Sequence, residues 1–395
     1  MLSAEALLWA SAAIVLYSYV GYPALVAVLA RFRPGPRVAK APIEPRVTLL
    51  IVAHNEEARI ENKLRNCLEV DYPRERLEVL VASDGSRDRT EDIVASFAPQ
   101  GVKLLPLPGP KGKPSALNEA VPRAQGEILV LCDARQRLAP SAIRELVAHF
   151  ADPQVGAVSG ELHILGGAGS TSGEGVGLYW KYEKAIRRAE GRLDSTVGAT
   201  GALYAFRKSL FQPIDPRTIL DDVAIPMNVT REGYRVTFEP RAAAFDEPAE
   251  DAAREYRRKV RTLAGNYQLV ALYPWLLDPR RNRLFWQFVS HKLSRLAVPW
   301  CLVVLFAASA WLGVQASPAY MSVFVAQALF YAMAVSGWRL EKLGRRPRLL
   351  SVPCALMLLN VAAAAALFGF LRGTHKAAWR AVEGATIMPV HEEAR

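Results

Sequence analysis

The chain has 395 residues, of which 51% are hydrophobic and 22% charged, and its formal net charge is +11. This length allows a sizeable core and a second module. A basic balance suits phosphorylated substrates, anionic lipids or nucleic acid, but the sequence has neither paired Cys/His zinc spacing nor an aromatic-basic RNA-binding motif, so we expect no nucleic-acid partner.

The first element is an apolar stretch from about Leu7 to Ala30, which is long enough to cross a bilayer. It is too long for the core of a signal peptide and has no basic segment before it, so we expect a retained transmembrane helix within residues 1–32. Basic residues follow it, at Arg31, Arg33, Arg37 and Lys40. By the positive-inside rule, the domain that comes next is cytoplasmic.

Residues 46–248 alternate short apolar runs with helical patterns. Strands are predicted at 47–53, 77–82, 102–107 and 127–132, and helices at 56–68, 88–97, 115–124 and 141–150. This βαβ alternation predicts an α/β fold with a Rossmann-like, mostly parallel sheet covered by helices on both faces. Ligands of such folds bind beyond the carboxyl ends of the strands.

Polar motifs end the first two predicted strands. The first reads Ala53-His54-Asn55-Glu56-Glu57 and the second Ser83-Asp84-Gly85-Ser86. An acid at a strand end can accept hydrogen bonds from a base or a ribose. The alternative is helix capping, because Asn55 and Ser86 suit turns that precede helices.

Two further motifs concern phosphate and metal. Lys113 precedes a predicted helix, where a lysine can bind phosphate with help from the helix dipole; an ordinary basic turn is the alternative. Asp133 follows the fourth strand, in Leu131-Cys132-Asp133-Ala134-Arg135. It is positioned to hold a divalent cation on a diphosphate, with capping as the alternative.

Two later motifs concern the acceptor. The small residues Gly198, Thr200 and Gly201 would let a sugar approach the backbone closely, or they form a turn before a strand. Asp221 and Asp222 open a helical run. Two acids there are stabilised by the helix dipole, and one of them could serve as a general base.

The last third of the sequence indicates membrane attachment. Residues 249–292 mix basic and aromatic side chains, which predicts amphipathic helices on the membrane surface. Residues 293–372 contain apolar stretches at about 296–314, 319–337 and 350–371, which brings the predicted transmembrane helices to four. The loop from Arg339 to Arg348 is then cytoplasmic and the tail at 373–395 external, although Arg372 argues for the opposite side. The orientation of the last helix is left open.

In this order, the motifs resemble those of family 2 glycosyltransferases with a GT-A fold. More closely, they resemble the membrane-embedded branch that includes cellulose, hyaluronan and poly-N-acetylglucosamine synthases. The resemblance covers about residues 47–299 and the flanking helices. It implies inverting transfer of a sugar from a nucleotide donor, expected to be a UDP-sugar, to a glycan or lipid-linked acceptor. The expected location is the cytoplasmic face of a bacterial inner membrane, in exopolysaccharide or cell-envelope glycan synthesis.

The resemblance also implies residue roles. Asp222 would be the catalytic base with Asp221 beside it, and Asp133 would bind Mg²⁺ or Mn²⁺. The nucleotide-sugar site would comprise Ala53, Asn55, Glu56, Asp84, Lys113, Asp133, Arg258 and Arg261. The acceptor site would include Gly198, Thr200 and Gly201.

Two departures from the family pattern matter. Arg135 replaces the second acid of the usual Asp-x-Asp motif, where it could neutralise phosphate charge directly. Thr262 stands where the synthases carry the Trp of Gln-x-x-Arg-Trp, which favours single-sugar transfer to a lipid carrier without polymerisation as an alternative. Four helices are few for a translocating channel, so a polymerase would need a homo-oligomer or an export partner. A nucleotidyltransferase and a non-catalytic membrane assembly subunit are the competing classes.

Overall fold

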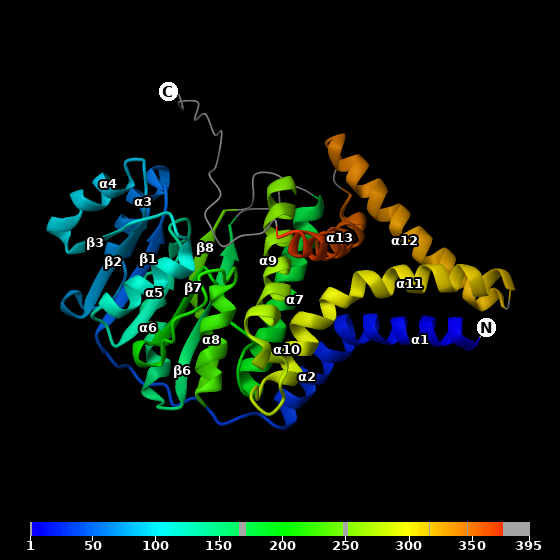
Figure 1. Ribbon diagram of the computed structural model, residues 1–395, viewed down its shortest axis with the longest axis horizontal. Helices are drawn as coiled ribbons and strands as arrows, with labels where there is room; N and C mark the ends of the chain where they lie inside the picture. Colours follow the sequence, from blue (N-terminus) through cyan, green and yellow to red (C-terminus); the bar gives the residue numbers. More distant parts are fainter. Residues whose placement is uncertain (1, 166–170, 248–251, 316, 346, 374–395) are drawn as a thin grey trace.

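The computed structural model describes residues 2–165, 171–247, 252–315, 317–345 and 347–373. An α/β domain lies at one end, and long helices extend away from it (Figure 1). Apart from residue 373, the predicted tail lies outside the described residues, as do 248–251 at the predicted boundary between the α/β domain and the amphipathic segment.

The α/β domain contains an eight-stranded sheet in the order β3-β2-β1-β4-β7-β6-β8-β5. The strands are β1 (Val47–Ala53), β2 (Leu77–Asp84), β3 (Val102–Leu107), β4 (Ile128–Cys132), β5 (Arg137–Leu138), β6 (Val155–Ile164), β7 (Leu203–Arg207) and β8 (Arg235–Asp246). The first four are mutually parallel, β7 is antiparallel to β4 and β6, β8 is parallel to β6, and β5 is antiparallel to β8. The predicted mostly parallel sheet is confirmed.

Helices cover both faces of this sheet. They are α3 (Glu57–Leu68), α4 (Thr90–Ser96), α5 (Lys113–Arg123), α6 (Ala142–Val147) and α8 (Asp221–Arg231). Alternate residues of β1 serve the two sides: Leu49 and Ile51 pack with α3, α4 and α6, whereas Leu50 and Val52 pack with α5 and α8. A strand buried on both faces needs a continuous apolar run, which is why this strand was readable from sequence.

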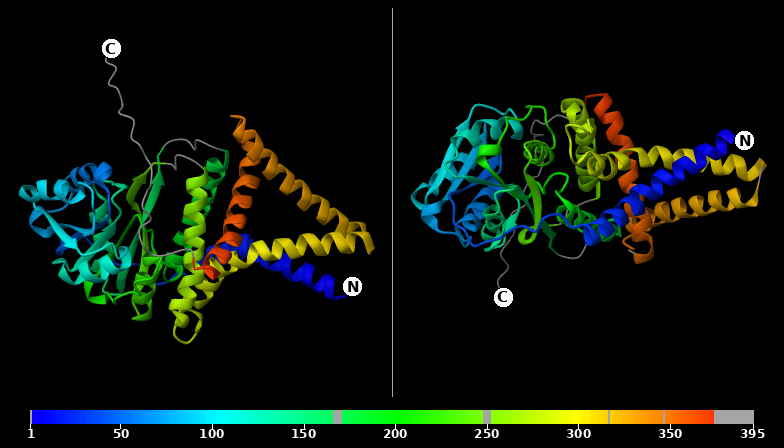
Figure 2. Two further views of the ribbon diagram at one scale, coloured as in Figure 1. Left: turned by 45° about the horizontal axis from the view of Figure 1, so that its top comes forward. Right: turned by 90° about the horizontal axis from the view of Figure 1, so that it is seen from below.

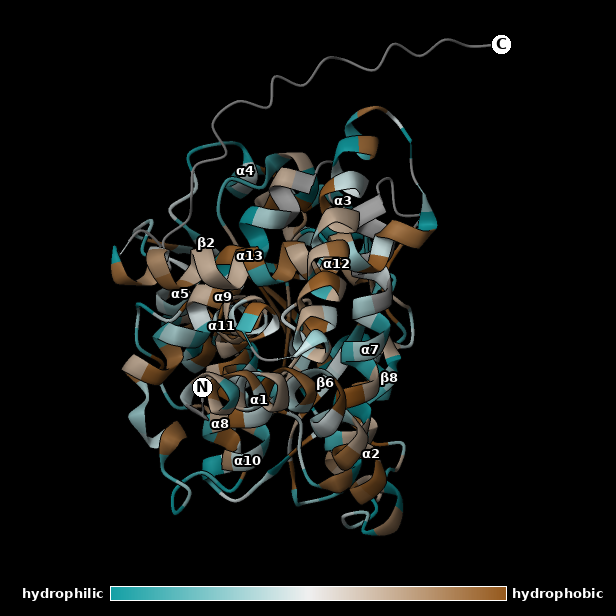
Figure 3. Cartoon of the chain, turned by 90° about the vertical axis from the view of Figure 1, so that its right-hand side faces the viewer, coloured by the Kyte–Doolittle hydropathy of each residue, from teal (hydrophilic) through white to brown (hydrophobic). Residues whose placement is uncertain are grey.

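Among the described residues, four helical segments are long and apolar enough to span a membrane: Ser3–Phe32, Phe285–Gln315, Pro318–Lys342 and Arg348–Leu371. They contain α1 (Leu2–Leu16), the π-turn η1 (Tyr17–Gly21), α2 (Tyr22–Phe32), α10 (Phe285–Phe288), the π-turn η7 (Val289–Leu293), α11 (Ser294–Gln315), α12 (Pro318–Lys342) and α13 (Ser351–Leu371). Large apolar side chains on them face outward, among them Trp9, which is 62% exposed, and Trp311, which is 58% exposed. Figure 3 shows the apolar residues along α1, α12 and α13.

The second of these segments begins eleven residues earlier than the predicted start at Leu296. The added turns carry His291, Lys292 and Arg295. Charged residues such as these normally end an apolar stretch, but His291 and Arg295 bind carboxylates of α7 (Thr171–Leu193). Their partners lie about a hundred residues away along the chain, so the apolar pattern alone could not predict this start.

Two helices separate the sheet from the long helices. They are α7, which the sequence analysis did not identify, and α9 (Ala252–Leu272), within the predicted amphipathic segment. Both run across the direction of α1 and α11 (Figure 1). They meet where the Lys259 ammonium lies 5.1 Å from the ring centre of Trp180.

The last long helix, α13, differs in direction from α1 and α11. It runs across α11 in both views of Figure 2. It packs along α9, where Val260 and Ala264 meet Ala362 and Ala366 in a small apolar core. The fourth candidate span therefore lies beside the transverse helices rather than parallel to the first two.

Candidate active site

The predicted motifs meet at one edge of the sheet, because the carboxyl ends of β1, β2 and β4 lie together. Ala53 at the end of β1 pairs in register with Ser83 of β2, and Ile51 pairs with Cys132 at the end of β4. Asp84 and Asp133 come directly after these positions. The parallel topology therefore gathers residues that are up to 80 positions apart in sequence.

Asp84 has a structural partner in this arrangement. Its side chain is almost fully buried and accepts hydrogen bonds from the backbone amides of Lys111, at 3.0 Å, and Gly112, at 2.6 Å. The ring of His54 lies 2.8 Å from the carbonyl oxygen of Asp84. Asp84 thus fixes the loop that leads into α5, and a nucleotide would meet a carboxylate that already binds two amides.

The first motif forms a tight turn beside Asp84. Asn55 has a φ of 54°, its side-chain oxygen accepts from the amide of Arg87 at 2.8 Å, and its own amide donates to Ser86 Oγ at 3.2 Å. Ala53 is fully buried, so no part of this residue lies on the surface of the site. Burial raises the pKa of Glu56, against the opposing effect of Arg59.

Lys113 lies at the centre of the site. Gly112, at a φ of 95°, turns the chain so that Lys113 begins α5. The Lys113 ammonium lies 2.9 Å from Asp133 Oδ1 and 3.3 Å from Asp221 Oδ2. Burial alone would lower the pKa of Lys113, but the two carboxylates outweigh it and raise that pKa. The lysine therefore stays charged and holds the ends of β4 and α8 together.

Asp222 lies next to this ion cluster. Burial, and then the charge of Asp221, raise the pKa of Asp222 to about 6, while Lys113, Arg187 and Lys292 act in the opposite direction. A carboxyl group with such a pKa can accept a proton near neutral pH. The role of Asp222 as general base stays a prediction.

The Gly198–Gly201 loop packs directly on Asp222. The amide of Ala199 donates to the Asp222 carbonyl oxygen at 2.7 Å. A Cβ atom added to Gly201 would lie 2.9 Å from Asp222 Oδ2, and Gly198 has a φ of 82°. Glycine is needed at both places, for a close approach and for a left-handed backbone. The proposed acceptor loop and the proposed base therefore form one structural unit.

The residue that departs from the Asp-x-Asp pattern is paired. Arg135 Nη2 donates to Asp246 Oδ2 at 2.6 Å, and Gln136 Nε2 donates to the same oxygen at 3.1 Å. Arg135 therefore neutralises the buried Asp246 at the end of β8. Within the described residues, no cluster of three or more His, Cys, Asp or Glu side chains is arranged for a metal.

A divalent cation nevertheless fits here as a partner of a diphosphate. Asp133 keeps 43% of its side chain exposed, so one carboxylate is open to the site. Mg²⁺ usually keeps several waters and binds through one or two carboxylates together with substrate phosphates. Asp133 is the carboxylate that matches this donor set.

Helix α9 carries the predicted Arg258 and Arg261. Other residues of this helix contact the two residues that precede Asp221. The amide of Ile219 donates to Gln268 Oε1 at 2.8 Å. A Cβ atom added to Gly265 would lie 2.6 Å from Leu220 Cγ. Arg261 is exposed to solvent, and the structure gives it no ion pair with a described acidic residue of the site.

The cations that act on Asp222 include two that sequence reasoning missed, Arg187 and Lys292. A signal for the first was present, because Glu183, Arg187 and Glu190 follow one another at steps of four and three along a helix. Lys292 lies inside an apolar helical segment, where a charged residue is itself a functional signal.

Residues 48–214 match the family described as Glycosyl transferase family 2. The chain is 28% identical over 247 residues to a "Probable glycosyltransferase YdaM" of Bacillus subtilis (strain 168), covering 57% of this chain and 56% of that protein. It is 22% identical over 264 residues to a poly-beta-1,6-N-acetyl-D-glucosamine synthase of Staphylococcus epidermidis, covering 66% and 63%. The chain thus spans less than two thirds of the length of these relatives.

Among solved structures, the chain resembles the mannosyltransferase PcManGT from Pyrobaculum calidifontis in complex with GDP-Man and Mn²⁺. The TM-score is 0.72 and the identity 24%, and the match covers 93% of this chain and 100% of that one. This likeness shows the fold, from the α/β domain through to the long helices.

Proposed function

We propose that the protein is an inverting glycosyltransferase, on the premise that residues 48–214 match the Glycosyl transferase family 2 model. It transfers a sugar from a nucleoside diphosphate, expected to be UDP, to a glycan or lipid-linked acceptor at the cytoplasmic face of a membrane. The expected setting is exopolysaccharide or cell-envelope glycan synthesis at a bacterial inner membrane.

One observation carries this proposal. Lys113 links Asp133 and Asp221 at 2.9 and 3.3 Å, directly beside an Asp222 whose pKa is raised to about 6. A cation on one side suits a leaving diphosphate, and a carboxylate able to accept a proton on the other suits an acceptor hydroxyl. The proposal puts the sugar between these two groups, because a single displacement needs the base and the leaving group on opposite sides of the anomeric carbon.

In the proposed mechanism, Asp222 takes the proton of the acceptor hydroxyl while that oxygen forms a bond to the anomeric carbon. The bond from that carbon to the diphosphate breaks, and the nucleoside diphosphate leaves with the electron pair. Lys113 is the cation nearest to Asp133, where the diphosphate would bind, so it stabilises the charge that develops. Asp222 is partly buried, and the lower local dielectric there strengthens both effects.

Mg²⁺ or Mn²⁺ would be held by Asp133 and the donor phosphates. When bound, it supplies positive charge against the leaving diphosphate. That GDP-Man and Mn²⁺ are present together in the Pyrobaculum mannosyltransferase structure is consistent with this proposal.

Membrane attachment supports an amphiphilic or exported product. The candidate spans lie on one side of α7 and α9 and the sheet on the other (Figure 1). The basic residues of α9, including Arg257 and Arg261, would then meet anionic headgroups. An acceptor that is itself held at the membrane would reach Asp222 from this side.

A second candidate is transfer of one sugar to a lipid carrier. Thr262 is exposed and its hydroxyl donates to the Arg258 carbonyl oxygen at 3.0 Å, so this position offers no aromatic ring for a growing glycan to stack on. The length of the product separates this candidate from a polymerase. Single transfer gives a product with one added sugar, whereas a polymerase gives products of many lengths.

The test is release of nucleoside diphosphate by the purified full-length protein in nanodiscs. The donor panel contains UDP-glucose, UDP-N-acetylglucosamine, UDP-galactose and GDP-mannose, each with Mg²⁺ or Mn²⁺ and with bacterial lipid extract as acceptor source. Asp222→Asn is the matched control, because it keeps the size of the side chain and removes the base.

Release from one donor, lost in Asp222→Asn and accompanied by a labelled lipid or glycan, is the expected result. Release from GDP-mannose alone would correct the expected nucleotide and keep the reaction. If the wild-type protein released nothing from any donor in the presence of the extract, or if Asp222→Asn released as much as the wild type, the proposal would be wrong.

A further inference from the structure

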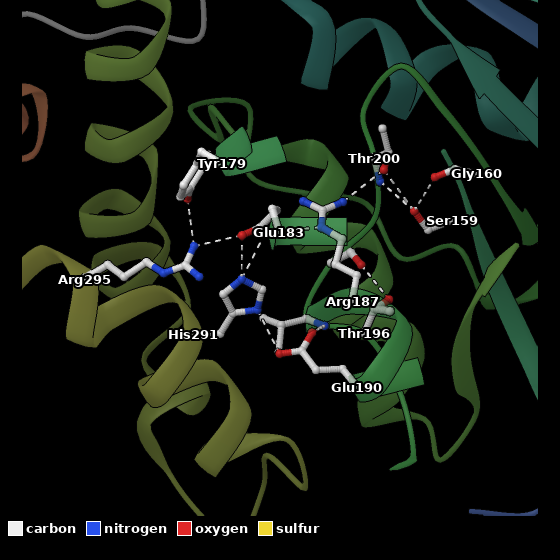
Figure 4. Close-up of polar contacts among 12 residues, drawn as sticks. Ser159, Gly160, Tyr179, Glu183, Arg187, Glu190, Thr196, Thr200, His291 and Arg295 are labelled. Carbon is white, nitrogen blue, oxygen red and sulfur yellow. Dashed lines mark hydrogen bonds and ion pairs between the residues drawn. The ribbon is translucent and has the colours of Figure 1, made fainter. Parts of the chain in front are cut away.

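A buried charged cluster, drawn in Figure 4, joins the candidate spans to α7. His291 is almost completely buried between two carboxylates of α7: its Nδ1 lies 2.8 Å from Glu190 Oε1, and its Nε2 lies 3.0 Å from Glu183 Oε1. Glu183 and Glu190 are two helical turns apart, so one face of α7 presents both.

Further donors hold these carboxylates. Tyr22, on the first candidate span, donates to Glu190 Oε1 at 2.5 Å, and Arg295, on the second, donates to Glu183 Oε2 at 2.8 Å. Burial alone would raise the pKa of Glu183, but His291 and Arg295 outweigh it and hold that pKa well below its usual range. Both ring nitrogens of His291 therefore face carboxylate oxygens of α7, and Arg295 adds a charged donor to the same Glu183.

Arg187 connects this cluster to the acceptor loop. Its Nε lies 3.3 Å from Glu183 Oε1, and its Nη1 donates to Thr200 Oγ1 at 2.9 Å. The amide of Thr200 donates to Ser159 Oγ at 2.9 Å, so the same residue is also tied to β6. Glu190 reaches the start of the loop, where it accepts from the amide of Val197 at 3.4 Å.

The loop in turn sets the surroundings of the base. Thr200 lies between Ala199, whose amide bonds to the Asp222 carbonyl oxygen, and Gly201, whose Cα approaches the Asp222 carboxylate closely. A displacement of Thr200 would therefore move the loop against Asp222. Continuous contacts run from His291 through Glu183, Arg187 and Thr200 to this loop (Figure 4).

We propose that Arg187 is a positioning residue for the acceptor, held in place by Glu183 and His291, and that it fixes the Gly198–Gly201 loop at the distance from Asp222 that transfer needs. The inference rests on the proposed function, because it assigns the acceptor side of that same site. It also implies that the candidate membrane spans contribute to catalysis, since their residues Tyr22 and His291 bind the carboxylates of Glu183 and Glu190 on α7.

The first test compares Arg187→Met with Arg188→Met in the full-length protein. Arg188 is the next residue on α7 and pairs with Glu161, a buried acid that Lys184 also binds, so the control loses the same charge without touching the loop. We expect Arg187→Met to lower kcat/KM for the acceptor about 10- to 100-fold, since a misplacement of about 1 Å can cost about a hundredfold. The Kd of the released nucleoside diphosphate should stay within about twofold.

The second test asks whether Arg187 acts through Thr200. Thr200→Val removes the hydroxyl that accepts from Arg187, and Thr200→Ser keeps it. Thr200→Val should lower acceptor kcat/KM, and Thr200→Ser should restore it to within about threefold. If both residues act through one bond, the double variant Arg187→Met/Thr200→Val loses no more than the worse single variant. This pair also provides the test if Arg187→Met does not fold.

Two results would overturn the inference alone: equal acceptor kinetics in Arg187→Met and Arg188→Met, or a Thr200→Val variant as active as Thr200→Ser. A nucleotide Kd that weakened as much as acceptor kcat/KM would point to general loss of structure and would also reject it. A wild-type protein that transfers no sugar would overturn the proposed function and this inference together.

Discussion

The ammonium of Lys113 lies 2.9 Å from Oδ1 of Asp133. This pair joins the N-terminus of α5 to the end of β4, at the place where a donor diphosphate and its cation would bind. A lysine so placed neutralises the acids while the donor is absent and can turn to phosphate oxygens when the donor arrives. Donor binding would then exchange one set of ionic contacts for another.

The first prediction concerns Lys113→Met. A hydrogen bond to a charged group contributes about 1.5–3 kcal/mol, so donor KM should rise about 10- to 100-fold. Lys113 also lowers the pKa of Asp222, so its removal should move the acid limb of the pH profile to higher pH. Initial rates over a donor series at several pH values measure both effects. An unchanged donor KM would remove Lys113 from the donor site.

Asp222→Asn should abolish transfer, with a loss of at least about 10³-fold, because the amide cannot accept the proton. The same change should leave the free energy of unfolding equal or higher, by on the order of 1 kcal/mol, since a buried carboxylate beside Asp221 is unfavourable. Thermal unfolding in detergent and donor turnover measure the two effects. Retention of a tenth of the activity would assign the base elsewhere.

The pH dependence follows from the raised pKa of Asp222, which is about 6. A base must be deprotonated to work, so acceptor kcat/KM should be constant above pH 7 and fall about tenfold per pH unit well below 6. The variant Asp222→Glu keeps a carboxyl group at this position, so its pH profile should retain an acid limb. A flat profile from pH 5 to 7 would show that no group of this pKa limits the reaction.

Arg135→Asp restores the usual Asp-x-Asp pattern, yet it should impair the protein. It removes the 2.6 Å bond to Asp246 and leaves that buried carboxylate beside a new negative charge. We expect a loss of about 1–3 kcal/mol in unfolding free energy and no gain in Mn²⁺ affinity. The swapped pair Arg135→Asp/Asp246→Arg should recover part of the stability. Tighter Mn²⁺ binding by the single variant would contradict this account of Arg135.

Much of the α/β domain was predictable. The structure reproduces the predicted bounds of β1, a buried strand that is a short apolar run between turn residues. It also reproduces those of β3, an edge strand whose first and last residues, Val102 and Leu107, are buried. The meeting of Asp84, Asp133 and the first motif at one sheet edge followed from the topology. Features that depend on the local apolar pattern and on the order of the strands could therefore be predicted from the sequence.

Contacts between segments that lie far apart in the sequence could not be predicted. Helix α7 has glycines in its first turns and charged residues along its length, and it was not recognised as a helix from the sequence. Its Glu183 and Glu190 become favourable only when His291, about a hundred residues later, lies between them. Likewise, the carboxylate of Asp84 was expected to meet a nucleotide, and only the folded loop shows that the amides of Lys111 and Gly112 bind it.

The direction of α13 leads to a prediction about membrane sides. A helix that runs across α11 and packs on α9 would keep Arg345 and Arg372 on one face of the membrane, which also agrees with the positive-inside rule. Arg345→Cys and Arg372→Cys should therefore react with a membrane-impermeant maleimide from the same side, above the background of the native cysteines. Labelling from opposite sides would show that α13 crosses.

The missing side chain at Gly265 has a geometric consequence. The side chain of Leu220 fills the space where a Cβ would be, so the backbone of α9 packs directly on the side chains that precede Asp221. If α9 rests on the bilayer surface, this contact fixes the height of the Asp222 carboxylate above the lipid headgroups. The length of a membrane-held acceptor would then decide whether its hydroxyl reaches the Asp222 carboxylate.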